Sequence, residues 1–303
     1  MLTTFGALAP VFLLIALGWL LRARNFPGDA FWPGAERLVY WILFPALLLL
    51  TTAGSDLTGF RTLPITLALV AAVLLTAALT FALRGRLGLD GASFTSVFQG
   101  AIRNNTYVGL AGAGALYGEA GLEVMGILVF VVVTLVNVLS VIVLLSHRGR
   151  AMDVGDLLVS VAKNPLILAC VGGFVLNATG LGLFGLATAM LDILGSAALT
   201  LGLLCVGAGL EPGRLGRNPP AVVATSILKL VIMPVATWAF CRLFGVEGVT
   251  AATALLFTAA PVSASSYVLA RQLGGDAPLM ASLITITTIL AAVTIPLALA
   301  LLT

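Results

Sequence analysis

Polar residues interrupt two long apolar stretches of this sequence, and they are its strongest candidates for chemistry. One run spans residues 103–106, and the other spans residues 261–266. Arg103 would add positive charge at the first run, which favours an anionic ligand. The candidate ligand-binding residues are Arg103, Asn104, Asn105, Thr106, Pro261, Ser263, Ser265 and Ser266.

Each polar run predicts a break in a helix. Asn and Ser favour helix caps over helix interiors, because their side chains compete for backbone groups, and Pro261 removes a backbone donor. A second half-helix would start after each run, with side-chain caps from Asn105, Thr106, Ser265 and Ser266. Two helix N-termini would then direct partial positive charge at one place, and a carboxylate is the typical ligand for such a site.

The other reactive side chains do not form a catalytic set. The single histidine, His147, and the scattered acids supply no metal triad, no paired-carboxylate or Ser/Lys dyad and no phosphate-binding motif. Three cysteines, Cys170, Cys205 and Cys241, lie inside apolar stretches without paired spacing. We therefore expect no enzyme activity, no catalytic residue, no bound metal and no cofactor.

The elements that position the polar runs must lie in a membrane. Of the 303 residues, 60% are hydrophobic and only 9% are charged, with a mean hydropathy of +1.16. Such a chain cannot cover a soluble domain with charge, and its apolar runs of about 20 residues can each cross a bilayer core. A net charge of +3, without a basic patch interleaved with aromatic residues, does not favour nucleic acid. The expected helices, numbered 1 to 10, lie at 4–22, 33–54, 61–83, 91–115, 119–146, 158–177, 186–210, 219–241, 248–272 and 276–301.

Basic residues predict the orientation of these helices. Ten of them flank the loops after odd-numbered helices, whereas Arg61 and Arg242 follow even-numbered ones. Loops rich in Arg and Lys stay in the cytoplasm, so both termini are expected outside a multi-pass protein of the cell (inner) membrane.

The two halves of the chain resemble each other. Pro10 and Gly18 align with Pro165 and Gly173 at a shift of 155 residues. Five helices per half would turn the second half upside down, so we expect two inverted repeats, 1–150 and 151–303. In transporters of this architecture the binding site lies at the repeat interface near the bilayer centre.

The same motifs resemble the auxin efflux carrier family, which includes the plant PIN auxin exporters and many bacterial permeases. Residues 101–107, Ala-Ile-Arg-Asn-Asn-Thr-Tyr, are similar to the Arg-Asn-Pro-Asn-Thr-Tyr motif of PIN proteins, although the Pro is missing here. Residues 261–276 resemble the Pro…Ser-Tyr-Val-Leu-Ala-Arg…Gly-Gly-Asp signature of the family. The resemblance extends over essentially the whole chain.

This resemblance implies a fold like that of bile-acid symporters and sodium/proton antiporters. Broken helices 4 and 9 would cross, helices 1, 2, 6 and 7 would form a scaffold, and helices 3–5 and 8–10 a mobile core with an elevator-like motion. Asn105 would contact the carboxylate of an organic anion, such as an auxin-like or dicarboxylic acid, and Pro261 would form the second half of the crossing. Members of the family are often homodimers.

Two further ionisable residues, Asp192 and Lys229, lie inside apolar segments, where a charge is unfavourable by about 2.5–3.5 kcal/mol. Their expected depths differ by roughly 6 Å, which a lysine side chain can span, so an ion pair is one interpretation. Proton coupling through Asp192 and attraction of an anion by Lys229 are the others. Asn137 is expected to make a hydrogen bond between helices.

These features lead to a secondary transporter of small organic anions working by alternating access. A sodium-coupled organic-anion symporter of the bile-acid type is the alternative, and carboxylate or Asn/Thr ligands beside helix 9 would favour it. A channel or a sensor is a third class, but inverted repeats with broken helices favour a carrier.

Overall fold

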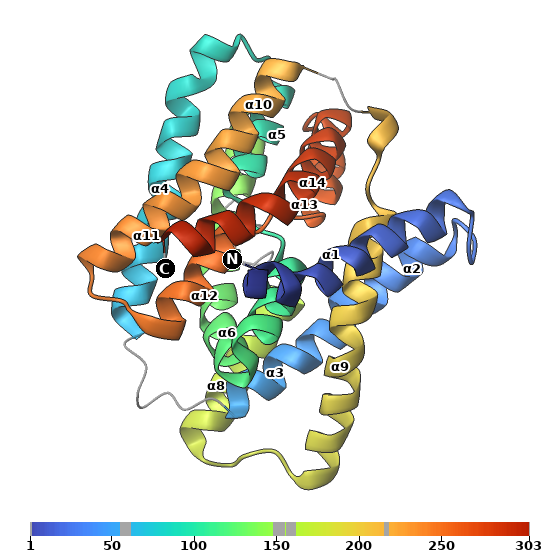
Figure 1. Ribbon diagram of the computed structural model, residues 1–303, viewed down its shortest axis with the longest axis vertical. Helices are drawn as coiled ribbons and strands as arrows, with labels where there is room; N and C mark the ends of the chain where they lie inside the picture. The colour runs from blue at the N-terminus through green and yellow to red at the C-terminus, as the bar shows by residue number, and fades with distance from the viewer. Residues whose placement is uncertain (1, 55–61, 148–154, 156–161, 215–217, 303) are drawn as a thin grey trace.

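The structure is a computed structural model that describes residues 2–54, 62–147, 155, 162–214 and 218–302 (Figure 1). Within these ranges the chain is helical and has no strand, apart from one isolated two-residue bridge. The helices are α1 (Leu2–Ala23), α2 (Phe31–Leu38), η1 (Val39–Leu43), α3 (Phe44–Gly54), α4 (Thr62–Leu87), α5 (Gly91–Ile102), α6 (Thr106–His147), α8 (Pro165–Thr179), α9 (Gly185–Ala208), η2 (Pro212–Arg214), α10 (Pro219–Ile227), η3 (Leu228–Ile232), α11 (Met233–Leu243), α12 (Gly248–Ala259), α13 (Ser265–Leu273) and α14 (Ala277–Leu302).

Most of these helices suit a bilayer. Over the described residues, seven segments are long and apolar enough to cross a membrane, and two shorter apolar helices, α8 and α12, accompany them. Two of the seven segments run through a short π-helical stretch, η1 in residues 31–54 and η3 in residues 219–243. The expected all-helical, multi-pass membrane fold is therefore confirmed.

The helix boundaries differ from the expected ones in two places. The helix expected at 158–177 begins at Pro165, because Asn164 leaves the helical conformation and its Oδ1 accepts hydrogen bonds from the backbone N–H groups of the first turn. Residues 158–161 of that prediction lie outside the described residues. The second half of helix 4 and helix 5 are joined in α6, which bends sharply at Gly118, where φ is 59°.

Both predicted helix breaks are present. Helix α5 ends at Ile102 and α6 begins at Thr106, while α12 ends at Ala259 and α13 begins at Ser265. Polar and Pro-containing runs thus stop regular helix where their propensities predict it.

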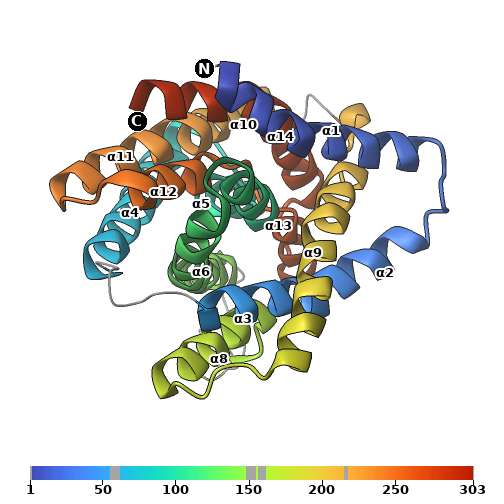
Figure 2. The same ribbon diagram turned by 60° about the horizontal axis from the view of Figure 1, so that its bottom comes forward.

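The helices pack in two groups, which Figures 1 and 2 show from different sides. In the first group α1 packs against α9, and α3 packs against both α8 and α9. In the second group α4 packs against α11 and α5, and α14 packs against α5, α10, α12 and α13. Helix α6 contacts members of both groups, so it links them.

Glycines bring helices of the first group close together. A Cβ on Gly18 would collide with the backbone of Leu204 in α9, and one on Gly173 would lie 2.9 Å from the backbone oxygen of Leu49 in α3. Gly18 and Gly173 are 155 positions apart, and so are Leu49 and Leu204. The same close contact therefore recurs at the spacing by which the two halves of the sequence align.

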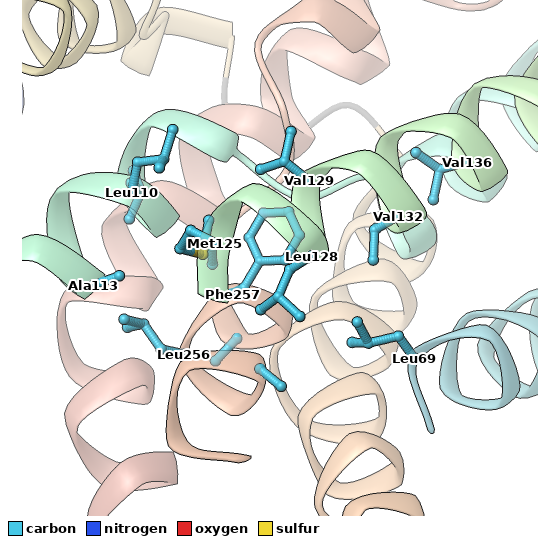
Figure 3. Packing of buried hydrophobic residues seen from close by; sticks show 14 of the residues in the cluster. Leu69, Leu110, Ala113, Met125, Leu128, Val129, Val132, Val136, Leu256 and Phe257 are labelled. Atoms are coloured by element: carbon cyan, nitrogen blue, oxygen red, sulfur yellow. The ribbon is translucent and has the colours of Figure 1, made fainter. Parts of the chain in front are cut away.

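An apolar cluster supports the breaks from one side (Figure 3). Met125, Leu128 and Val132 of α6 lie beside Phe257 of α12 and Leu69 of α4 in this view, and all five are buried. Helices in a bilayer associate through close van der Waals packing, so this cluster holds α12 against the part of α6 that follows Gly118.

Candidate functional site

The two helix breaks cross each other in the centre of the molecule. Asn104 and Val262 form an antiparallel bridge. The N–H of Asn105 donates to the carbonyl oxygen of Pro261 at 2.8 Å, and the N–H of Ser263 donates to that of Arg103 at 3.3 Å. The two breaks thus supply hydrogen-bond partners for each other's backbone groups that are not bonded within a helix. Unwound chain inside a membrane needs such partners, because lipid offers none.

Asn105 begins the second half of the first broken helix. Its Oδ1 accepts hydrogen bonds from the backbone N–H groups of Tyr107 (3.1 Å) and Val108 (3.3 Å), which have no helical partner at this end. The predicted cap at Asn105 is therefore confirmed. Thr106 lies inside the first turn instead of capping it, so that alternative was wrong.

Arg103 ends the first half of the same helix and connects three elements. It is the C-cap of α5, and only 7% of the residue is exposed. Its Nη1 donates to Asn137 Oδ1 in α6 at 2.7 Å, and its Nη2 donates to Ser265 Oγ in α13 at 3.0 Å. The expected interhelical hydrogen bond of Asn137 is confirmed, with Arg103 as the donor.

The serines of the second break differ from the prediction. Ala264 occupies the N-cap position of α13, with no side-chain cap, so the predicted caps at Ser265 and Ser266 were wrong. The Ser265 hydroxyl instead accepts from Arg103 and lies 2.9 Å from the Ser263 hydroxyl. Ser266 is fully buried, and its hydroxyl has no hydrogen-bond partner among the described residues. The Ser265 hydroxyl, predicted from local sequence to cap the helix, therefore makes a tertiary contact with Arg103 instead.

Lys229 reaches the crossing from a third element. It lies in η3 with 0% exposure, and its Nζ contacts Asn104 Oδ1, donates to the Thr258 carbonyl oxygen at 3.0 Å and lies 3.3 Å from Met233 Sδ. Asp192 is exposed on α9 and forms no ion pair with Lys229. The expected ion pair between them was wrong, because η3 packs against α5, α12 and α14 and directs the lysine to the crossing.

Several buried hydrogen-bond donors at the crossing have no acceptor among the described residues. Arg103 Nε, Asn104 Nδ2 and Asn105 Nδ2 are buried without a hydrogen-bond partner among the described residues. The side-chain oxygens of Asn104 and Asn105 are already used, by Lys229 and by the first turn of α6. Neither Arg103 nor Lys229 forms an ion pair with an acidic side chain in the described part of the chain. Such an array can receive hydrogen-bond acceptors and negative charge.

Sequence reasoning missed two neighbours of the crossing. The amide of Gln99, one turn before Arg103 on α5, is fully buried, and neither of its polar atoms has a hydrogen-bond partner in the described ranges. The ring of Tyr107 stacks on Phe44 of α3, with centroids 4.3 Å apart. Gln99 stood out in the sequence only as a polar residue in an apolar helix.

The described residues contain no group of three His, Cys, Asp or Glu side chains that could hold a metal.

Fold and crossing together define a multi-pass helical membrane protein with a buried, donor-rich centre. A model of the membrane transport protein family matches residues 3–299. An uncharacterized transporter from Methanothermobacter thermautotrophicus is 25% identical over 289 residues, which cover 95% of this chain and 94% of that protein. The chain belongs to this membrane transport family, the auxin efflux carrier family that its motifs resemble.

Proposed function

We propose that this protein is a secondary transporter that moves small organic anions across the cytoplasmic membrane by alternating access. The carrying observation is the set of buried donors at the crossing, Arg103 Nε, Asn104 Nδ2 and Asn105 Nδ2. A buried polar group without a partner is unfavourable by about 1–3 kcal/mol. A carboxylate between these groups would satisfy them, so binding would recover that free energy.

Charge at the crossing also supports an anion. Arg103 and Lys229 bring two basic side chains, and no acidic side chain of the described residues pairs with either. Helices α6 and α13 begin at the crossing, and helix N-termini carry partial positive charge. These fields would act together in a site from which bulk water is largely excluded, where they are weakly screened.

We propose ten spans in two inverted repeats, 1–150 and 151–303, for this carrier. The spans would be α1, α2–α3, α4, α5 with α6 up to Gly118, the rest of α6, α8, α9, α10–α11, α12–α13 and α14. The recurrence of the Gly18–Leu204 contact as Gly173–Leu49 supports the repeat. At the crossing, each break donates one backbone hydrogen bond to the other, on either side of the Asn104–Val262 bridge. This approximate two-fold relation also supports the inverted repeat.

The two packing groups support a scaffold and a transport core. Spans 1, 2, 6 and 7 of this scheme are the first group, and the second group supplies spans 3 and 8–10 and the α5 part of span 4. The linking helix α6 completes span 4 and forms span 5, so we assign it to the core with the crossing. Sliding of the core along the scaffold would carry the site between the two sides, as in an elevator mechanism. The start of α1 and the end of α14 lie near each other in Figures 1 and 2, which agrees with an even number of spans.

Lys229 favours a sodium-independent carrier over the sodium-coupled symporter. Its ammonium group already contacts the Asn104 side-chain oxygen and the Thr258 carbonyl oxygen. An alkali cation at the crossing would need oxygen ligands of this kind, and it would be repelled by the fixed charge at short range.

Transport currents from purified protein on a solid-supported membrane test the proposal. Short dicarboxylates and indole-3-acetate are applied with and without sodium and a pH gradient. Asn105→Asp is the matched control, because its carboxylate keeps the cap of α6 but removes the Nδ2 donor and repels an anion. We expect sodium-independent currents for a carboxylate in the wild type and none in the variant. Silence toward every anion would contradict the function, and currents unchanged in the variant would contradict the site.

A further inference from the structure

Lys229 and Asn104 form a buried contact between the π-helical stretch of one helix and the break of another. Asn104 lies in the break between α5 and α6, with 5% exposure, and Lys229 is fully buried in η3. The Lys229 ammonium contacts Asn104 Oδ1, and the Thr258 carbonyl oxygen and Met233 Sδ hold it from other sides. The ammonium is therefore fixed by acceptors from α12 and α11 as well as from the break.

This contact determines which way the Asn104 amide faces. An ammonium group has three donors and no acceptor, so only the oxygen of an amide can face it. The terminal torsion of an asparagine is otherwise soft, and its oxygen and nitrogen ends exchange by a half turn. With the oxygen held by Lys229, the Asn104 Nδ2 group must point away from it, and this group is buried without a hydrogen-bond partner in the part of the chain that the structure describes.

The same rule applies to the next residue. Asn105 Oδ1 accepts from two backbone N–H groups, which also leaves its nitrogen end unpartnered. The protein thus orients two adjacent amides so that each presents a donor and neither presents an acceptor. For Asn105 the orienting group is the backbone, whereas for Asn104 it is a single side chain.

We propose that Lys229 is a positioning residue that makes the crossing select a carboxylate over the corresponding uncharged carboxamide. The inference rests on the proposed function and names the source of its specificity. A carboxylate offers two acceptor oxygens to the donors, whereas a carboxamide brings an NH2 group that would meet another donor. Discrimination of this kind comes from the mismatch with the wrong ligand as much as from affinity for the right one.

Two roles of Lys229 make different predictions. If it acts only as a positive charge, it favours an anion whatever side chain stands at position 104. If it acts through the amide, its contribution to selectivity disappears when the amide is removed. A double-mutant cycle separates the two roles, because it measures the coupling between the two side chains.

The test measures binding of acid and amide pairs to the purified, detergent-solubilised protein by calorimetry. The probes are indole-3-acetate with indole-3-acetamide, and succinate with succinamide. The readout is the ratio of the two dissociation constants within a pair. Variants are Lys229→Met, Asn104→Ala and the double variant, with Met233→Leu as a control that removes only the sulfur contact.

We expect Asn104→Ala to lower the preference for the acid about tenfold although the Lys229 charge is still present. Lys229→Met should lower it by a similar factor, and the double variant should be no less selective than Asn104→Ala alone. Preservation of the acid preference in Asn104→Ala, or equal effects of Lys229→Met with and without the amide, would overturn the inference and leave the proposed function intact. If Lys229→Met does not fold, Lys229→Gln replaces it in the cycle, because its uncharged amide can accept as well as donate and no longer forces the oxygen of Asn104 to face it. A wild type that binds none of the probes would contradict the proposed function, and this inference with it.

Discussion

The Arg103 guanidinium donates to the Ser265 hydroxyl at 3.0 Å, and this bond joins the end of α5 to the start of α13 across the crossing. The other terminal nitrogen donates to Asn137 in the long part of α6. One side chain thus ties together both broken helices and the helix that follows the first of them. Arg103 is buried and pairs with no carboxylate of the described residues, so these neutral acceptors stabilise it.

Loss of the Asn137 acceptor should destabilise the protein. We expect Asn137→Leu to lower the free energy of unfolding by about 1–3 kcal/mol, since the variant leaves a buried charged donor without its 2.7 Å partner. Thermal unfolding of the purified protein in detergent measures the effect. Thr134→Val is the control one turn earlier on α6, because Thr134 bonds only the carbonyl oxygen of Phe130 in its own helix. Equal unfolding temperatures for the two variants would contradict a structural role for the Arg103–Asn137 bond.

Asn105 should contribute separately to stability and to binding. Asn105→Ala removes the cap of α6 and should lower stability by about 1 kcal/mol. Asn105→Asp keeps an oxygen for the same two N–H groups and should unfold close to the wild-type temperature. Both variants should lose carboxylate binding, because both lose the Nδ2 donor. Retention of binding in the aspartate variant would exclude this donor from the site.

Local propensity predicted the breaks, and tertiary contacts decided what the residues in them do. The Asn105 side chain lies directly before a helix start, where an asparagine oxygen accepts from backbone N–H groups, so its cap was predictable. Ser265 was assigned the same role, but Arg103 from another helix uses its hydroxyl. No pattern along the chain reports a contact between residues 162 positions apart.

The contact between Lys229 and the first break was partly predictable from the expected depth of each residue along its helix. In the expected orientation Lys229 would lie about 15 Å from the inner surface along its helix, and the first break about 18 Å from the same surface, at 1.5 Å per residue. Matching depths would have paired Lys229 with the break. Opposite charge suggested Asp192 instead, but Asp192 is exposed on α9, and the lysine finds oxygen acceptors of no formal charge. The direction in which a helix presents a residue cannot be read from depth alone.

Asp90 should make stability depend on pH. It caps α5, and the hydrogen bond from the Ser93 backbone N–H (2.7 Å) holds the pKa of this carboxyl below its usual range. Its stabilising contribution is therefore complete above the unfolded pKa of about 3.9 and is lost as the pH falls through the lower folded value. We expect Asp90→Ala to lower stability by about 0.5–1 kcal/mol at pH 7, near the low end for caps because the site is exposed.

Thermal unfolding from pH 7 down to pH 3 measures this dependence. The gap between wild type and Asp90→Ala should narrow toward acid, because protonation weakens the wild-type cap. Asp90→Ser keeps a capping oxygen without the charge, so the difference in stability between Asp90→Ser and Asp90→Ala should stay constant with pH. A gap that widens on acidification would show that the carboxylate acts elsewhere.

The glycine contacts of the first packing group should be intolerant of any side chain. Gly18→Ala would place a Cβ against the Leu204 backbone, and Gly173→Ala would crowd the Leu49 carbonyl oxygen and Thr52. Backbone atoms cannot rotate away as a side chain can, so each variant should lose about 1–3 kcal/mol of stability.

Gly6→Ala is the matched control in the same helix as Gly18, because nothing lies within 4 Å of its Cβ position. It should gain about 0.5–1 kcal/mol, since alanine stabilises a helix interior relative to glycine. If Gly18→Ala and Gly173→Ala lower the unfolding temperature by similar amounts while Gly6→Ala raises it, both helix contacts are equally close. A tolerated Gly173→Ala would break the equivalence of the two halves on which the inverted-repeat proposal depends.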